Sequence, residues 1–196
     1  MNLAIFLPIE YQCSSLVIRK LSRILQNKTV SKVYLNCIEH VLAEDIRGFF
    51  GIPLEALGEP TDVSHAIIFA DSFSLSESEK EFTRHIPRAN IRKISVPVTR
   101  VINIKRTHPQ EVLHNSRYIG RKTLFGNPYS QFEVGTKEEA CRLFRYDFER
   151  ELLPHGLTNQ VVTRELQGRH LACSCKPSLC HGDIYAEFLN RFDHEL

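Results

Sequence analysis

Short apolar runs alternate with amphipathic segments along the first half of the chain. The apolar runs that have the length of β-strands occupy residues 3–7, 30–38, 65–71 and 91–104. Between them, apolar residues recur at helical spacing over residues 14–25, 41–52 and 74–86. Gly51 and Pro53 mark the end of the second helix, and Pro97 breaks the last strand-like run. This alternation predicts a parallel sheet with helices on its faces.

The second half has a less regular pattern. The segment 117–132 contains Gly120, Gly126, Asn127 and Pro128, which predicts a shaped loop. A strong helix is expected from the Thr136/Glu139 capping pattern onward. The remaining elements are expected to be a short helix over 161–166, a strand over 170–175 and a last helix from about His181. We therefore expect an α/β domain over residues 1–98 and a smaller α/β domain over 99–196.

Composition restricts the class of protein. No apolar run approaches the ~20 residues that a membrane-spanning helix needs. The N-terminal stretch MNLAIFLPIEYQ has no basic start and soon meets Glu10, so we expect a first strand rather than a signal peptide. These features favour a cytoplasmic protein without a membrane partner, in which the six cysteines are thiols or metal ligands.

Positive charge is concentrated between residues 84 and 122. This stretch holds ten Lys and Arg residues and one acid, so it carries +9 while the rest of the chain carries −7. A solvated face explains such a run, and so does a surface that binds phosphate, nucleic acid or an acidic partner protein. No recognised nucleic-acid-binding motif accompanies the run, so nucleic acid is not specifically indicated.

The stretch LACSCKPSLCHGD, residues 171–183, places three cysteines and a histidine within nine positions. Cys173, Cys175, Cys180 and His181 form a Cys₃His set, which makes zinc the candidate cofactor in one interpretation. In a regular strand, Cys173 and Cys175 would have Cα atoms roughly 6.5 Å apart. Their sulfurs must lie within ~4 Å of each other to share a zinc ion, so either the side chains converge or the strand bends at Cys175.

Two other interpretations of this stretch remain open. In an open α/β sheet, ligands bind beyond the carboxyl ends of the strands, which is where Cys175 is expected. Cys180 and His181 would then begin a helix, where the helix dipole favours a thiolate, and Asp183 would orient the imidazole or cap the helix. Cys180, His181 and Asp183 are the catalytic candidates in this interpretation. In the third, the cysteines simply fill the core.

The loop over 117–132 supplies candidate ligand contacts. Arg121 and Lys122 are expected to hold phosphate, and Asn127 to donate a hydrogen bond to the ligand. The ligand-binding candidates are Gly120, Arg121, Lys122, Gly126, Asn127 and Cys175. A purely structural interpretation is that Gly120 and Gly126 permit a positive φ.

Three motifs in order, VINIKR, YIGRKTLFGNPY and LACSCKPSLCHGD, give the C-terminal half a recognisable signature. Over residues 100–190 it resembles the bacterial and phage family called domain of unknown function 4326. Its last motif also resembles domain of unknown function 488, where an Arg stands at the position of Gly182. The N-terminal half resembles the Rossmann-like nucleotide-sensing folds related to nucleoside deoxyribosyltransferases. It has PIEYQCSS where they have a glycine-rich phosphate turn, which argues against direct nucleotide binding by this half.

The leading hypothesis is an enzyme that acts on a nucleoside, nucleotide or nucleotide-derived molecule at a Cys/His site at a strand end. The deoxyribosyltransferase resemblance implies cleavage or exchange at a glycosidic bond. One alternative is a non-enzymatic zinc or thiol module that binds nucleic acid or a partner protein, such as a phage protein that blocks a host factor. Another is a protein that sequesters a nucleotide signal intact.

Overall fold

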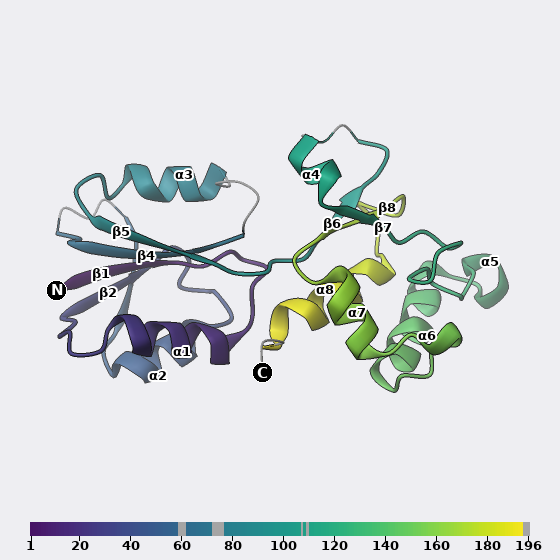
Figure 1. The fold of residues 1–196 in the computed structure, drawn as a ribbon, viewed down its shortest axis with the longest axis horizontal. Coiled ribbons are helices and arrows are strands. Elements are labelled where there is room, and N and C mark those ends of the chain that lie inside the picture. Colours follow the sequence, from purple (N-terminus) through teal and green to yellow (C-terminus); the bar gives the residue numbers. More distant parts are fainter. Residues whose placement is uncertain (59–61, 72–76, 107, 109, 194–196) are drawn as a thin grey trace. The chain divides into compact units, whose positions relative to one another are not determined.

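The structure, a computed structural model, describes residues 1–58, 62–71, 77–106, 108 and 110–193; the side chains of residues 77 and 111 are not described. The chain divides into two compact units (Figure 1). The first unit comprises Met1–Val96 together with Arg191–Leu196, and the second comprises Pro97–Asn190.

The N-terminal unit is built on a five-stranded sheet in which all neighbouring strands are parallel. Its strands are β1 (Asn2–Phe6), β2 (Lys32–Leu35), β3 (Leu54–Ala56), β4 (His65–Ala70) and β5 (Asn90–Ser95), in the order β3-β2-β1-β4-β5. The central strand β1 pairs Leu3 with Val33 on one side and with His65 on the other. Because both of its faces are covered, β1 is an almost continuous apolar run.

Helices cover both faces of this sheet (Figure 1). Helices α1 (Ser14–Ile24) and α2 (Ala43–Phe50) lie on one face, and α3 (Glu77–Arg84) lies on the other. On the α3 side, Phe6 and Phe82 pack edge to face with their ring centroids 5.3 Å apart. Helix α2 ends at Gly51, whose φ of 66° is the left-handed conformation that glycine adopts without strain.

The C-terminal unit is built on a three-stranded parallel sheet. Its strands are β6 (Arg100–Asn103), β7 (Ser116–Tyr118) and β8 (His170–Cys173), in the order β6-β8-β7. Its helices are α4 (Gln110–His114), α5 (Gln131–Val134), α6 (Lys137–Glu149), α7 (Asn159–Leu166) and α8 (His181–Arg191), with a short 3₁₀ turn at Pro154–Gly156. Side chains of α6, α7 and α8 form one core with the buried residues of β8.

The expected fold class is confirmed: an α/β chain with a larger parallel sheet in its N-terminal half and a smaller one after it. Pro97 does separate two strands, β5 and β6, which belong to different sheets. Thr136 caps α6 by accepting a hydrogen bond from the Glu139 amide at 3.0 Å. Five elements were not expected, β3, α4, β7, α5 and the 3₁₀ turn, and each has five residues or fewer. The expected start of the third helix at residue 74 lies outside the described residues.

In the part of the chain that the structure describes, no helix has both the length and the apolar character needed to cross a membrane.

The buried side chain of His40 connects two loops of the N-terminal unit through hydrogen bonds. His40 is 5% exposed, and its Nδ1 accepts a hydrogen bond from the Leu42 amide at 3.1 Å. The proton of the neutral ring therefore lies on Nε2, which donates to the Pro8 carbonyl at 3.1 Å. Burial lowers the pKa of His40, because a charged imidazole would be removed from water.

We expect the N-terminal unit to lose stability as the pH falls below about 6.5, the ordinary pKa of histidine. Below that pH the unfolded chain takes up a proton at His40 that the folded chain resists, so protonation favours unfolding. The loss is bounded by about 1.4 kcal/mol per pH unit. Urea denaturation at pH 7.5 and 5.5 measures it. The matched variant His40→Asn retains an acceptor but no titrating group, and it should show a smaller loss. Equal losses in both chains would contradict the assignment.

Candidate functional site

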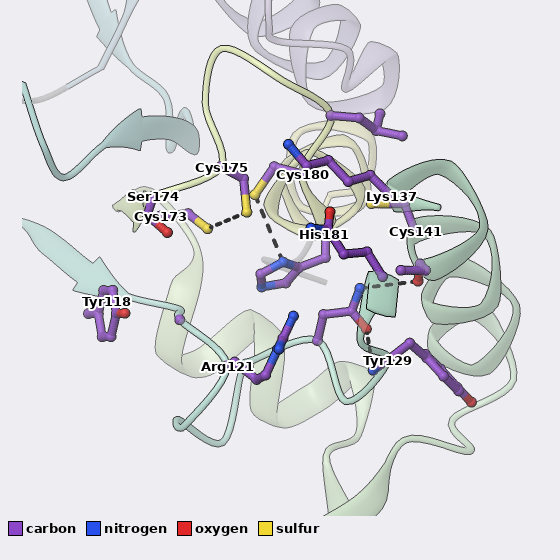
Figure 2. A pocket seen from close by; sticks show the side chains of 15 residues that line it. Tyr118, Arg121, Tyr129, Lys137, Cys141, Cys173, Ser174, Cys175, Cys180 and His181 are labelled. Carbon is purple, nitrogen blue, oxygen red and sulfur yellow. Dashed lines mark hydrogen bonds between the residues drawn. The ribbon is translucent and has the colours of Figure 1, made fainter. Parts of the chain in front are cut away.

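The carboxyl ends of strands β7 and β8 meet at one edge of the small sheet, because the strands are parallel. Ile119 and Gly120 follow β7, Ser174 and Cys175 follow β8, and the first turn of α8 comes next in the chain. A pocket of about 250 Å³ opens at this edge. Its walls are the ends of β7 and β8, the loop after β7, and the first turns of α6 and α8 (Figure 2).

Three cysteines meet on one side of this pocket. Cys173 is the last residue of β8, and the Cys173 and Cys175 sulfurs lie 3.4 Å apart. Cys180 immediately precedes α8, and the three sulfurs all lie within 4.8 Å of one another. The chain bends directly after Cys173, so two cysteines that a regular strand would hold apart can converge. Cys173 and Cys180 are almost fully buried, with exposures of 2% and 1%.

The three thiols differ in acidity. A hydrogen bond from the Cys180 thiol lowers the pKa of Cys173 to about 5, because it stabilises the thiolate. Burial raises the pKa of Cys175. The hydrogen bond to Cys173, together with burial, raises the pKa of Cys180. The hydrogen bonds among the three thiols therefore favour one negative charge in the cluster, with protonated neighbours beside it.

His181 is neutral and fixed in orientation. Its Nε2 lies 2.9 Å from the Ile119 carbonyl, to which it donates, so Nδ1 carries the lone pair. Nδ1 lies 3.9 Å from the Cys180 sulfur. Burial lowers the pKa of His181, whose ring is 5% exposed and packs edge to face against Phe144. A carbonyl of the loop after β7 therefore selects the tautomer.

Asp183 acts on the helix rather than on the imidazole. Its Oδ2 accepts a hydrogen bond from the Cys180 amide at 3.2 Å, which is the backbone half of a capping box. Its Oδ1 lies 2.5 Å from the Lys176 ammonium. The carboxylate thus fixes the turn between β8 and α8 from both ends. Of the two roles considered for Asp183, the geometry corresponds to the helix cap.

The glycines of the loop after β7 are required by close packing. A Cβ at residue 126 would lie 2.6 Å from the Gly120 carbonyl oxygen and 2.7 Å from the Arg121 Cα. A Cβ at Gly120 would meet the Tyr118 side chain at 2.0 Å. The interpretation that these glycines permit a positive φ is wrong, since neither is among the positive-φ residues. At Gly126 the loop folds so tightly on its own backbone that no side chain fits, whereas a side chain at Gly120 would require the exposed Tyr118 ring to move.

The polar residues of this loop differ in their positions. Arg121 lines the pocket, and its guanidinium donates to the Ser130 hydroxyl at 3.4 Å. Asn127 also lines the pocket, but its amide donates to the Ala140 carbonyl and accepts from the Tyr129 amide. Lys122 is exposed and, like Gly126 and Asp183, is not among the lining residues. Asn127 therefore joins the loop to α6.

Several lining residues were not anticipated from the sequence. Lys137 begins α6 and extends toward the sulfurs, and Tyr118 and Tyr129 flank the Arg121 loop (Figure 2). Cys141 of α6 is 9% exposed and also lines the pocket. The Thr136 cap already marked the start of α6, but only the packing of α6 against the loop brings Lys137 to the site.

The basic stretch over 84–122 is divided between the two units, with four of its cations before Val96 and six after Pro97. Most of these side chains are exposed. Lys93 pairs with Glu79 at 3.1 Å. Arg121 alone among the ten lines the pocket.

The variant Gly126→Ala should destabilise the C-terminal unit by about 1–3 kcal/mol, because the new methyl group meets backbone atoms that cannot move independently. Gly48→Ala, in the middle of α2 with no atom within 4 Å of the place a Cβ would take, is the matched control and should stabilise by up to about 1 kcal/mol. Denaturant titration followed by circular dichroism measures both. A Gly126→Ala chain as stable as the parent would contradict the close packing.

Comparison with known proteins agrees with both halves of this description. Residues 1–102 match the family described as Minimal SLOG domain, and residues 102–191 match the Domain of unknown function (DUF4326). The resemblances to domain of unknown function 4326 and to the Rossmann-like nucleotide-sensing folds are therefore confirmed.

The chain is also 41% identical over 73 residues to the "Uncharacterized 12.4 kDa protein in nrdA-td intergenic region" of Enterobacteria phage T4. This match covers 37% of the chain and 66% of the phage protein, which is just under two thirds of its length. No solved structure matches the chain. The chain therefore belongs to the Minimal SLOG domain family, whose domains are associated with nucleotide-related functions, and its residues 102–191 match the DUF4326 model.

Proposed function

We propose that this protein binds a phosphate-bearing, nucleotide-type small molecule in the pocket of its C-terminal unit and acts on it there. The observation that carries the proposal is the composition of the pocket. Two cationic side chains, Arg121 and Lys137, extend into the same cavity as a cluster of thiols at the carboxyl ends of parallel strands. The nucleotide-related functions of SLOG domains give the ligand class.

Phosphate is the group that these cations suit. A guanidinium presents paired donors to phosphate oxygens, and a lysine supplies a second, compact charge. Lys137 is also the first residue of α6, a helix of 13 residues, where unpaired amides and the helix dipole favour an anion. Arg121 lines the pocket and is positioned by its hydrogen bond to Ser130. We place the phosphate between Arg121 and the first turn of α6.

The size of the pocket indicates how much of the ligand it encloses. Its volume of about 250 Å³ is slightly below the ~300–1,000 Å³ of sites that enclose a whole drug-sized ligand. The phosphate and sugar would occupy the cavity, and the base would lie at its rim. Tyr118, which is 48% exposed and lines the pocket, offers a ring on which a base can stack.

For the reaction we propose cleavage or exchange at the glycosidic bond, as the deoxyribosyltransferase resemblance implies. In hydrolysis the bond from the sugar to the base breaks, and the base leaves with the bonding electrons and takes a proton. A water oxygen bonds to the anomeric carbon and releases a proton. Among the catalytic candidates, His181 adjoins the pocket as the group that handles protons, Cys180 lies beside its Nδ1, and Asp183 positions both through the helix cap.

The variants Arg121→Gln and Lys137→Gln should each weaken binding of a nucleoside monophosphate by about tenfold or more, because each removes a charged hydrogen bond to phosphate. The corresponding nucleoside without phosphate should bind weakly to all chains. Isothermal titration calorimetry over a panel of nucleosides and nucleotides measures this. Arg164→Gln is the matched control, since it removes one charge of the same unit at a side chain that is 70% exposed and outside the pocket.

Equal affinity of parent and double variant for every nucleotide that binds would overturn the phosphate site. The reaction has a separate readout, the appearance of free base after incubation. Recovery of only intact ligand from denatured protein would leave the binding proposal standing and remove the reaction. The protein would then be one that sequesters its nucleotide.

A further inference from the structure

We propose that Cys173, Cys175 and Cys180 bind one zinc ion whose fourth coordination position faces the pocket. This proposal does not depend on which molecule the pocket binds. It rests on the position of the three sulfurs, on their surroundings and on the absence of a fourth protein ligand at the cluster among the described residues.

The sulfurs already have nearly the spacing of zinc ligands. Zinc–sulfur bonds of about 2.3 Å in a tetrahedron place neighbouring sulfurs about 3.8 Å apart. The Cys173 and Cys175 sulfurs are 3.4 Å apart, and all three lie within 4.8 Å of one another. Shifts of a few tenths of an ångström to about one ångström, within side-chain adjustment, would complete the geometry.

The backbone fixes the three ligands from two rigid elements. Cys173 ends β8, the central strand of the sheet, and Cys180 precedes α8. Between them, the Ser178 amide donates to the Cys175 carbonyl at 3.0 Å, which closes a tight turn. The Gly182 amide donates to the Cys180 sulfur at 3.4 Å. Amide donors to ligating sulfurs are the outer contacts that orient metal ligands.

Among the described residues, the cluster has no fourth protein ligand. Over the part of the chain that the structure describes, no histidine nitrogen or carboxylate oxygen joins the three sulfurs within 4.8 Å of all of them. His181 is held away from that role, because its Nε2 donates to the Ile119 carbonyl and its Nδ1 lies 3.9 Å from the Cys180 sulfur alone. Cys141 lines the same pocket but is outside the group of three.

All three sulfur-bearing residues line the pocket, so the remaining position of the ion is open to it. Zinc sites that keep one such position, with three protein ligands, are the kind that bind water or a substrate atom, whereas structural zinc sites are closed by four ligands. The open position would accept a donor atom of the molecule held by Arg121 and Lys137. The ion would supply Lewis-acid activation of that atom or of a water molecule.

Metal content tests the site directly. The full chain, produced without a metal-affinity tag and purified with a phosphine reductant, should contain about one zinc per chain by elemental analysis. Cys173→Ser, Cys175→Ser and Cys180→Ser should each lose most of it. Cys141→Ser, which removes a thiol from the same pocket but not from the cluster, should retain it. A folded parent that takes up no zinc after reconstitution, or a Cys175→Ser chain that retains it, overturns the proposal.

The open position has its own measurement, which also holds if a cysteine variant fails to fold. X-ray absorption at the zinc edge of the parent should show three sulfur neighbours and one oxygen or nitrogen neighbour. Azide added to the cobalt-substituted parent should change the visible absorption bands, because it enters the open position. His181→Gln should leave the metal content and the sulfur count unchanged. Four sulfur neighbours, or loss of the metal from folded His181→Gln protein, would show a closed site and overturn this part of the proposal.

These measurements of the metal site are made without nucleotide. The proposal of a zinc site is therefore tested separately from the proposal of nucleotide binding. A zinc-containing chain that binds no nucleotide would keep the metal proposal and remove the functional one. A metal-free chain whose nucleotide binding depends on Arg121 would do the reverse. Formation of a disulfide between Cys173 and Cys175 in place of metal binding, detected by mass spectrometry of protein in which free thiols are alkylated, would also count against zinc.

Discussion

The close approach of the first turn of α8 to strand β6 and to the residue after β7 is the constraint on which the C-terminal unit depends. A Cβ on Gly182 would lie 2.7 Å from the Ile119 Cδ1 and 3.2 Å from the Val101 methyl groups. With no side chain there, the helix start packs directly on the sheet edge. The His181 ring then reaches the Ile119 carbonyl, and Cys180 comes beside Cys173. The pocket, the imidazole tautomer and the sulfur cluster all follow from that one contact.

The opposite end of α8 is fixed just as specifically. Asn190 is 3% exposed, and its amide forms two hydrogen bonds with the backbone of Thr99, the residue before β6. The Thr99 hydroxyl in turn accepts a hydrogen bond from the Gly168 amide. Because the oxygen and the nitrogen of this buried side-chain amide both form hydrogen bonds, the amide fixes the helix end without leaving a buried polar atom unpaired. The helix that carries the site is thereby anchored at both ends within its own unit, which keeps the cysteine cluster on rigid supports.

The sequence predicts those features of the fold and the site that are determined within one segment of the chain, and not those that depend on packing between segments. Apolar strands such as β4 and the helix capped by Thr136 can be predicted from the sequence. The apolar run of the strand, and the capping residue and apolar spacing of the helix, each lie within one short segment. Strands β3 and β7 have three residues each, which is too short to show an alternation of apolar and polar residues. They are defined only by their pairing with neighbouring strands. The motifs suggest one candidate site for the cysteines and the Arg121 loop, but the parallel pairing of β7 with β8 that brings them together is not visible in the sequence. Lys137 and the true partners of Asn127 depend on how α6 packs, which no local pattern encodes.

The strand order of the two sheets has a consequence for the time course of folding. In the N-terminal unit the central strand β1 is the first to be synthesised, so later strands can add to it in turn. In the C-terminal unit the central strand is β8, the last of its three, and β6 and β7 pair only with it. Neither has a strand partner in that sheet until residue 170 and its neighbours leave the ribosome. About seventy residues of that unit must therefore wait, with unpaired strand edges, for one late segment, and such a nascent chain is the kind that chaperones protect from aggregation.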